Sequence, residues 1–93
     1  MQLSTVVTAS KDVVAQEVGG EMVLLDLASG QYFGLDKVGG RIWELLTEGP
    51  LSLGDLCETI ETEFDAPRVA IEADMLALAT SLGEQGLIFA KVD

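Results

Sequence analysis

The stretch MVLLDLASGQYFGLDKVGGRIWELL, residues 22–46, decides the fold because strand, turn, strand and helix follow one another almost without a linker. Residues 22–27 are an apolar run of strand length, and Gly30 suits the positive φ of a short hairpin loop. Residues 31–35 form a second, shorter strand. Asp36 then occupies an N-cap position, ahead of apolar residues at helical spacing. The stretch therefore predicts a hairpin joined directly to a helix.

Two glycines interrupt the start of this helix. Gly39 and Gly40 each cost about 1 kcal/mol relative to alanine in a helix interior. Their presence indicates either a close approach of the helix to the sheet or room for a ligand.

The chain before this stretch adds one more strand. Residues 13–18 have strand character, and a turn at residues 19–21 leads into the next strand, which is apolar on both faces. That pattern predicts a central strand covered on both sides. The strand at residues 31–35 then has one paired edge and one edge free to accept a partner strand. We expect residues 1–12 to be a flexible N-terminal arm outside a single domain, residues 13–93.

The chain after this stretch predicts two more helices, at about residues 53–64 and 68–85. Gly49 and Pro50 end the first helix, Ser52 caps the second, and Gly86 ends the third. Three strands followed by three helices, with a helix-turn-helix-like middle, predict an α+β fold. We expect a winged helix-turn-helix with a three-stranded antiparallel sheet followed by three helices.

The composition indicates one small folded domain. The chain has 93 residues, of which 48% are hydrophobic, so one core is feasible and disorder is not expected. The N-terminus lacks the features of a signal peptide, and no apolar stretch reaches transmembrane length. With the single Cys57, which fits a reducing compartment, these features predict a cytoplasmic protein.

The charge balance restricts the possible partners. Sixteen acidic residues against five basic ones give a formal net charge of −11. Binding to nucleic acid or to an anionic membrane depends on Lys and Arg, so we expect neither partner. The excess of acid favours a cationic partner, or it serves solubility alone.

The residues that usually perform catalysis are nearly absent. There is no histidine and only one cysteine, so neither an ordinary zinc site nor a histidine base can be built. A carboxylate pair such as Glu72 with Asp74 is a poor alternative, because residues two apart on a helix point in different directions. We therefore expect no enzymatic activity, no metal and no cofactor.

Several short motifs, in this order and spacing, resemble the PqqD-like proteins. They are GQYFGLD at residues 30–36, IWELL at residues 42–46 after Gly39, and EADM at residues 72–75. PqqD-like proteins are also known as the recognition elements of ribosomally made, post-translationally modified peptides. The resemblance covers roughly residues 10–90. It implies a protein that binds the leader segment of a precursor peptide and presents it to modifying enzymes.

The resemblance also implies where the leader binds. It would add a strand to the third strand of the sheet, in a cleft whose other wall is the third helix. The implied peptide-binding residues are Gln31, Tyr32, Phe33, Gly34, Leu35, Arg68, Ile71, Glu72, Asp74, Met75 and Leu78. Two arcs of the third helix could form the wall, and the sequence does not choose between them. One arc comprises Arg68, Glu72, Met75, Leu76 and Ala79, and the other Ile71, Asp74 and Leu78.

Within the family, YFGLD at residues 32–36 followed by the Gly39-x-x-Ile42-Trp43 pattern most resembles the discrete recognition proteins of lasso peptide pathways. This resemblance implies two partner enzymes, a leader peptidase and an ATP-dependent cyclase. The runner-up is a peptide chaperone of pyrroloquinoline quinone biosynthesis. A winged-helix regulatory protein is a further alternative, which the acidic charge disfavours.

Overall fold

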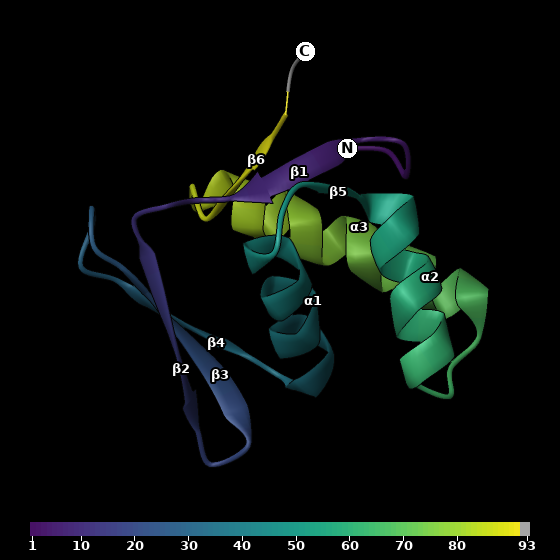
Figure 1. Cartoon of the computed structure of the whole chain (residues 1–93), viewed down its shortest axis with the longest axis horizontal. Coiled ribbons are helices and arrows are strands. Elements are labelled where there is room, and N and C mark those ends of the chain that lie inside the picture. The colour runs from purple at the N-terminus through teal and green to yellow at the C-terminus, as the bar shows by residue number, and fades with distance from the viewer. Residues whose placement is uncertain (92–93) are drawn as a thin grey trace.

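The computed structural model describes residues 1–91, which form two small sheets and three helices (Figure 1). The last two residues of the expected domain, 92 and 93, lie outside the described residues. In chain order the elements are β1 (Val6–Ala9), β2 (Val13–Val18), β3 (Glu21–Asp26), β4 (Tyr32–Leu35), α1 (Lys37–Thr47), β5 (Leu51–Ser52), α2 (Leu53–Glu63), α3 (Arg68–Glu84) and β6 (Ile88–Ala90).

The three-stranded antiparallel sheet followed by three helices is confirmed. Strands β2, β3 and β4 form an antiparallel meander with β3 in the middle. Gly30 has a φ of +75° in the turn between β3 and β4, as that hairpin requires. One expectation was wrong, however, because β3 is covered on one face only. Leu24 is completely buried beneath α1, whereas Val23 and Leu25 on the opposite face are only half-buried.

The expected helix starts are also confirmed. The Asp36 carboxylate accepts a hydrogen bond from the Gly39 backbone N–H at 2.8 Å, and the Ser52 hydroxyl accepts one from the Asp55 N–H at 3.1 Å. Gly40 explains how α1 approaches the sheet, because a Cβ at this position would lie 3.1 Å from the Met22 Cβ. Close approach is therefore one reason for the glycine pair.

The N-terminal segment differs from the flexible arm that we expected. Strand β1 lies within residues 1–12 and is the middle strand of a second sheet, between β5 and β6. Val7 is completely buried in the core. Local sequence could not show this pairing, because both partner strands are very short and lie far along the chain. The segment is part of the fold.

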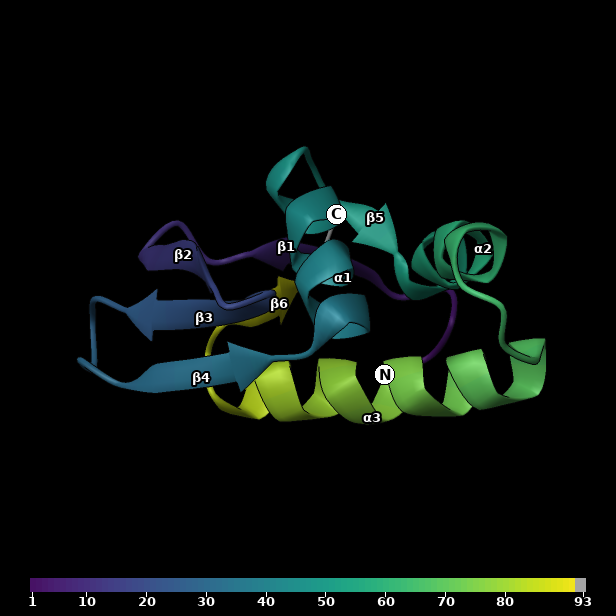
Figure 2. The same ribbon diagram turned by 90° about the horizontal axis from the view of Figure 1, so that it is seen from below.

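The helices and the two sheets enclose one apolar core. Helix α1 packs on β3, β1 and α2, and α2 packs on α3. In Figure 2, α3 runs along one side of the molecule, beneath β4 and α1. The core includes Leu24, Trp43, Leu53, Leu56 and Leu87. No helix within residues 1–91 has both the length and the apolar character needed to cross a membrane.

Candidate functional site

Strand β4 pairs with β3 along one edge, and no strand within residues 1–91 pairs with its other edge, which is the free edge. It pairs with β3 so that Phe33 lies opposite Leu24 and Tyr32 opposite Leu25. The Asp26 N–H donates to the Gln31 carbonyl at 2.9 Å, and bonded and non-bonded pairs alternate in an antiparallel ladder. The backbone N–H and C=O groups of Phe33 therefore form hydrogen bonds with β3. The backbone N–H and C=O groups of Tyr32 and Gly34 point the other way, to the free edge.

The side chains of β4 are divided between the two faces of the sheet. Leu35 is buried, and the half-buried Phe33 packs against the core. Tyr32 is 70% exposed, and Gly34 is exposed as well. Gln31 lies just before the strand. Of the five residues expected here to bind the peptide, Tyr32 and Gly34 are therefore the ones whose backbone groups are available.

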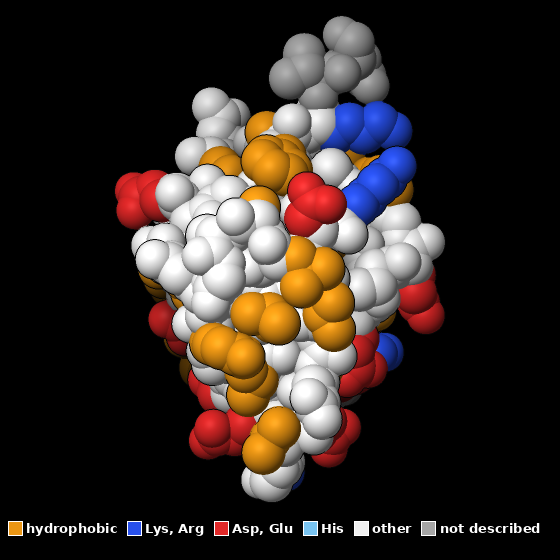
Figure 3. Space-filling model, turned by 90° about the vertical axis from the view of Figure 1, so that its left-hand side faces the viewer, with side chains coloured by type: hydrophobic (Ala, Val, Ile, Leu, Met, Phe, Trp, Pro, Cys, Tyr) orange, Lys and Arg blue, Asp and Glu red, His pale blue; other side chains and the backbone are white. Residues whose placement is uncertain are grey.

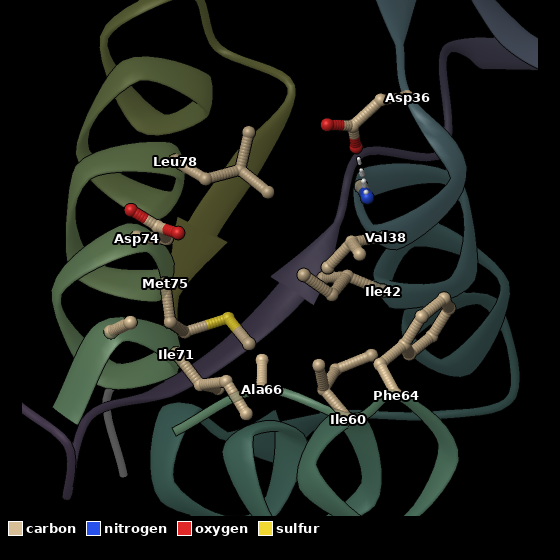
Figure 4. A pocket seen from close by; sticks show the side chains of 12 residues that line it. Asp36, Val38, Ile42, Ile60, Phe64, Ala66, Ile71, Asp74, Met75 and Leu78 are labelled. Carbon is tan, nitrogen blue, oxygen red and sulfur yellow. Dashed lines mark hydrogen bonds between the residues drawn. The ribbon is translucent and has the colours of Figure 1, made fainter. Parts of the chain in front are cut away.

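A cavity of about 290 Å³ opens beside the end of this strand (Figure 4). It lies among the first turns of α1, the end of α2 and the N-terminal two-thirds of α3. Its walls are formed by Asp36, Val38, Gly39, Ile42, Ile60, Phe64, Ala66, Ala70, Ile71, Asp74, Met75 and Leu78. Because Asp36 directly follows β4, the free edge leads to this cavity. Gly39 lines the cavity as well, but a Cβ at this position would lie 3.3 Å from the Leu35 side chain and from the Asp36 carboxylate, so close approach explains this glycine too.

The cavity is mainly apolar, with a carboxylate on each of two opposite walls. Figure 4 shows Asp36 on the α1 side and Asp74 on the α3 side. One oxygen of Asp36 caps α1, and both side chains are exposed at the opening. Such a site suits an apolar side chain with a hydrogen-bond donor or a positive charge beside it.

The structure brings together one of the two possible arcs of α3. Ile71, Asp74 and Leu78 line the cavity together with Met75. Arg68 and Glu72, which belong to the other arc, do not line it. The Arg68 Nε donates to the Glu72 carboxylate at 2.8 Å, and its Nη1 reaches Glu61 of α2 at 3.3 Å. Arg68 thus joins α3 to α2, and Glu72 holds the Arg68 side chain from the same helix.

The cavity walls that α1 and α2 contribute were not predicted from the sequence. The motif IWELL places Ile42 on the first helix, but nothing in the sequence indicates that Ile42 or Ile60 of α2 lines a cavity. Phe64 follows the end of α2, and no local pattern indicated that this end faces α3. The walls are joined by an ion pair between Arg41 and Glu63. The hydrogen bonds between them raise the pKa of Arg41 and lower that of Glu63.

The described part of the chain offers little for catalysis. No group of three or more carboxylate, Cys or His side chains in residues 1–91 is arranged to hold a metal ion. Cys57 is completely buried, and burial raises the pKa of its thiol. A buried, protonated thiol is a poor nucleophile.

Comparison with known proteins agrees with this geometry. The family model described as coenzyme PQQ synthesis protein D (PqqD) matches residues 21–88. A search of curated proteins found no significant match. One similar solved structure is TbiB1 in complex with the TbiA(beta) leader peptide. It is 36% identical, with a TM-score of 0.80, over 92% of this chain and 99% of that chain.

A second solved structure is also similar. It is a lasso peptide synthetase B1 complexed with the leader peptide, 30% identical with a TM-score of 0.76. The match covers 89% of this chain and 96% of that chain. Both similar structures are thus complexes with a leader peptide, and both match nearly the whole chain.

Proposed function

Because this chain belongs to the PqqD family, we propose that it binds the leader segment of a ribosomally made precursor peptide and delivers it to modifying enzymes. The observation that carries the proposal is the free edge of β4 beside an apolar cavity. Two solved leader-peptide complexes with the same fold support it. The protein binds and delivers the peptide and performs no chemistry of its own.

The leader binds by strand addition. Its backbone pairs with the free N–H and C=O groups of Tyr32 and Gly34, which supply affinity without reading the peptide's sequence. Side chains of the peptide that point toward α3 enter the cavity, where Ile71, Met75 and Leu78 select them by shape. In this arrangement Arg68 and Glu72 support α3 from outside the cavity.

The pathway is that of a lasso peptide, and the partner enzymes are a leader peptidase and a cyclase. The likeness to a lasso peptide synthetase B1 over nearly the whole chain supports this assignment. The family model is described by coenzyme PQQ synthesis, so a role in that pathway is the alternative. A ribosomally made precursor meets the protein in the cytoplasm, a compartment that the unpaired Cys57 fits.

Two substitutions at Gly34 test the binding mode. Gly34→Pro removes an outward N–H and places the proline ring where the added strand would lie, but it leaves the bonds between β4 and β3 intact. Gly34→Ala is the matched control, because a Cβ at this position meets nothing within 4 Å. Leader affinity is measured by titration calorimetry, and folding by circular dichroism.

We expect wild-type protein and Gly34→Ala to bind the leader peptide, and folded Gly34→Pro to bind at least about tenfold more weakly. Equal affinity of the two variants would show that the peptide does not pair with this edge. No binding by the wild-type protein, to leaders of either pathway, would contradict the proposed function itself.

A further inference from the structure

The sheet β2–β3–β4 has an outer face on which no helix of residues 1–91 packs. Helix α1 packs on the opposite face, where Leu24 is buried. The register places Val14 opposite Leu25, and Leu25 opposite Tyr32, so these three side chains form one row across the outer face. The alternation along each strand adds further apolar members. We define the outer face by Val14, Val18, Val23, Leu25, Leu27 and Tyr32.

Several apolar side chains are exposed on this face. Val14 is 51% exposed, Val18 56% and Leu27 60%, and Tyr32 is more exposed still. Four of the seven exposed large hydrophobic residues in the described chain therefore lie on one face of one small sheet. Figure 3 shows apolar side chains, in orange, running down this side of the molecule as a patch. A gathered patch of this kind marks an interaction surface, whereas scattered apolar residues would not.

The charges around the patch indicate the kind of partner. Along the three strands, Glu21 at one end is the only charged residue on the outer face. Figure 3 shows mostly carboxylates on its two flanks, with basic side chains near its upper end. An apolar centre with a charged rim is the usual anatomy of a protein interface. A second copy would bring the same net charge of −11 and be repelled. A partner with an apolar patch edged by Lys and Arg fits better.

The outer face is continuous with the proposed peptide site. The Tyr32 side chain lies on this face, while its backbone N–H and C=O lie at the free edge of β4. A peptide strand paired with that edge would extend the sheet and place every second side chain on the outer face. A protein docked here would contact the recognition protein and the bound peptide together.

We propose that the outer face is the docking surface for the enzyme that processes the bound precursor. The enzyme contacts it through an apolar patch surrounded by Lys and Arg. This inference rests on the proposed function and adds the place where delivery occurs. It separates two surfaces of one sheet: the free edge with the cavity holds the peptide, and the outer face holds the enzyme.

Two glutamate substitutions on β2 test the inference. Val14→Glu and Val18→Glu each place a carboxylate in the patch, on the strand farthest from β4. Val69→Glu is the matched control, because Val69 on α3 is 81% exposed and lies off the outer face. Each variant is assayed for leader affinity by titration calorimetry and for cleavage of the full precursor by the leader peptidase of the pathway. Its molecular mass in solution is measured by light scattering.

We expect all three variants to bind the leader within about twofold of the wild-type protein. We expect Val14→Glu and Val18→Glu to lower kcat/KM for precursor cleavage by about tenfold or more, as interface disruption does, and Val69→Glu to leave it unchanged. Unchanged cleavage with both outer-face variants would overturn the inference. So would a wild-type dimer that Val18→Glu dissociates, because a second copy would then occupy the face. A wild-type protein that does not bind the leader would overturn the proposed function as well. The calorimetric measurement of leader binding does not involve the enzyme, so the two failures can be told apart.

Discussion

The guanidinium group of Arg41 on α1 binds both carboxylate oxygens of Glu63, the last residue of α2. The Nε–Oε1 distance is 2.8 Å and the Nη2–Oε2 distance is 2.9 Å. Each residue is followed in the chain by a cavity residue, Ile42 and Phe64 respectively. The paired, fork-like geometry restricts how α2 can move relative to α1. The ion pair therefore helps set the width of the cavity between these helices.

The first prediction concerns the pH dependence of this pair. Its hydrogen bonds lower the pKa of Glu63 in the folded state. A carboxylate with a lowered folded pKa stabilises the fold at pH values above its unfolded pKa, and that contribution is lost as the pH falls through the folded pKa. Glu63→Gln should therefore lower the Tm slightly near neutral pH and make no difference in strong acid. Thermal unfolding followed by circular dichroism between about pH 7 and about pH 3 measures this.

The control for this experiment is Glu58→Gln, also on α2. The structure gives Glu58 no ion pair within the described residues. Near neutral pH the Tm of Glu63→Gln should lie below that of Glu58→Gln. In acid the Tm of Glu63→Gln should rejoin that of the wild-type protein, whereas Glu58→Gln should show no such pH-dependent difference. A constant difference from wild type at every pH would show that Glu63 acts through packing and not through its charge.

The second prediction separates the two arcs of α3. Leu78 lines the cavity, whereas the half-buried Leu76 packs against the core away from it. Leu78→Ala should weaken leader binding by about 1–3 kcal/mol, as truncation of an anchor contact does. Leu76→Ala should change it by less than about 0.5 kcal/mol. Titration calorimetry of the two variants provides the comparison, and the opposite ranking would assign the peptide to the other arc.

The third prediction concerns the reactivity of the single thiol. Cys57 is completely buried within the core, and desolvation raises its pKa. Both effects protect it from alkylating reagents, so reaction requires opening of the fold. Modification of the native protein near pH 8 should be on the order of a hundredfold slower than in a denaturant that unfolds it. Similar rates in both conditions would mean that α2 opens readily.

The hairpin and the helix starts could be predicted because their signals are local. Asp36 three residues before Gly39, and Ser52 three residues before Asp55, are capping patterns that the structure shows as hydrogen bonds. Gly30 likewise marks a turn that needs a positive φ. These interactions span a few residues, so a pattern in the sequence is sufficient to find them.

The features that could not be predicted from the sequence depend on contacts between distant segments of the chain. Strand β1 is stabilised by β5 and β6, neither of which has enough residues to show a strand pattern of its own. The cavity wall at Phe64 exists because α2 ends beside α3, a matter of packing angle and not of sequence spacing. The rotation of α3 against its neighbours similarly decides which of its residues line the cavity. Ile71, Asp74 and Leu78 line it, and Arg68 and Glu72 do not.

The last prediction concerns the two carboxylates at the cavity opening. Asp36 and Asp74 lie on opposite walls, in a chain of net charge −11. Their field attracts a leader that carries Lys or Arg near its anchoring residues, and charge of this kind mainly speeds encounter. Because salt screens exposed charges, the association rate should fall as ionic strength rises. Stopped-flow fluorescence with a labelled leader peptide measures the rate.

Asp74→Asn should lower the association rate at low salt by about two- to fivefold and have little effect at about 1 M salt, where screening is nearly complete. Glu84→Gln is the control. The substitution also removes one negative charge, but Glu84 lies at the end of α3 that is far from the cavity. Asp36 is left unchanged, since its carboxylate also caps α1. If both variants slow association equally, the peptide is attracted by the overall charge of the protein and not by the carboxylates at the cavity opening. A wild-type rate that stays flat with salt would show that charge plays no part in the encounter.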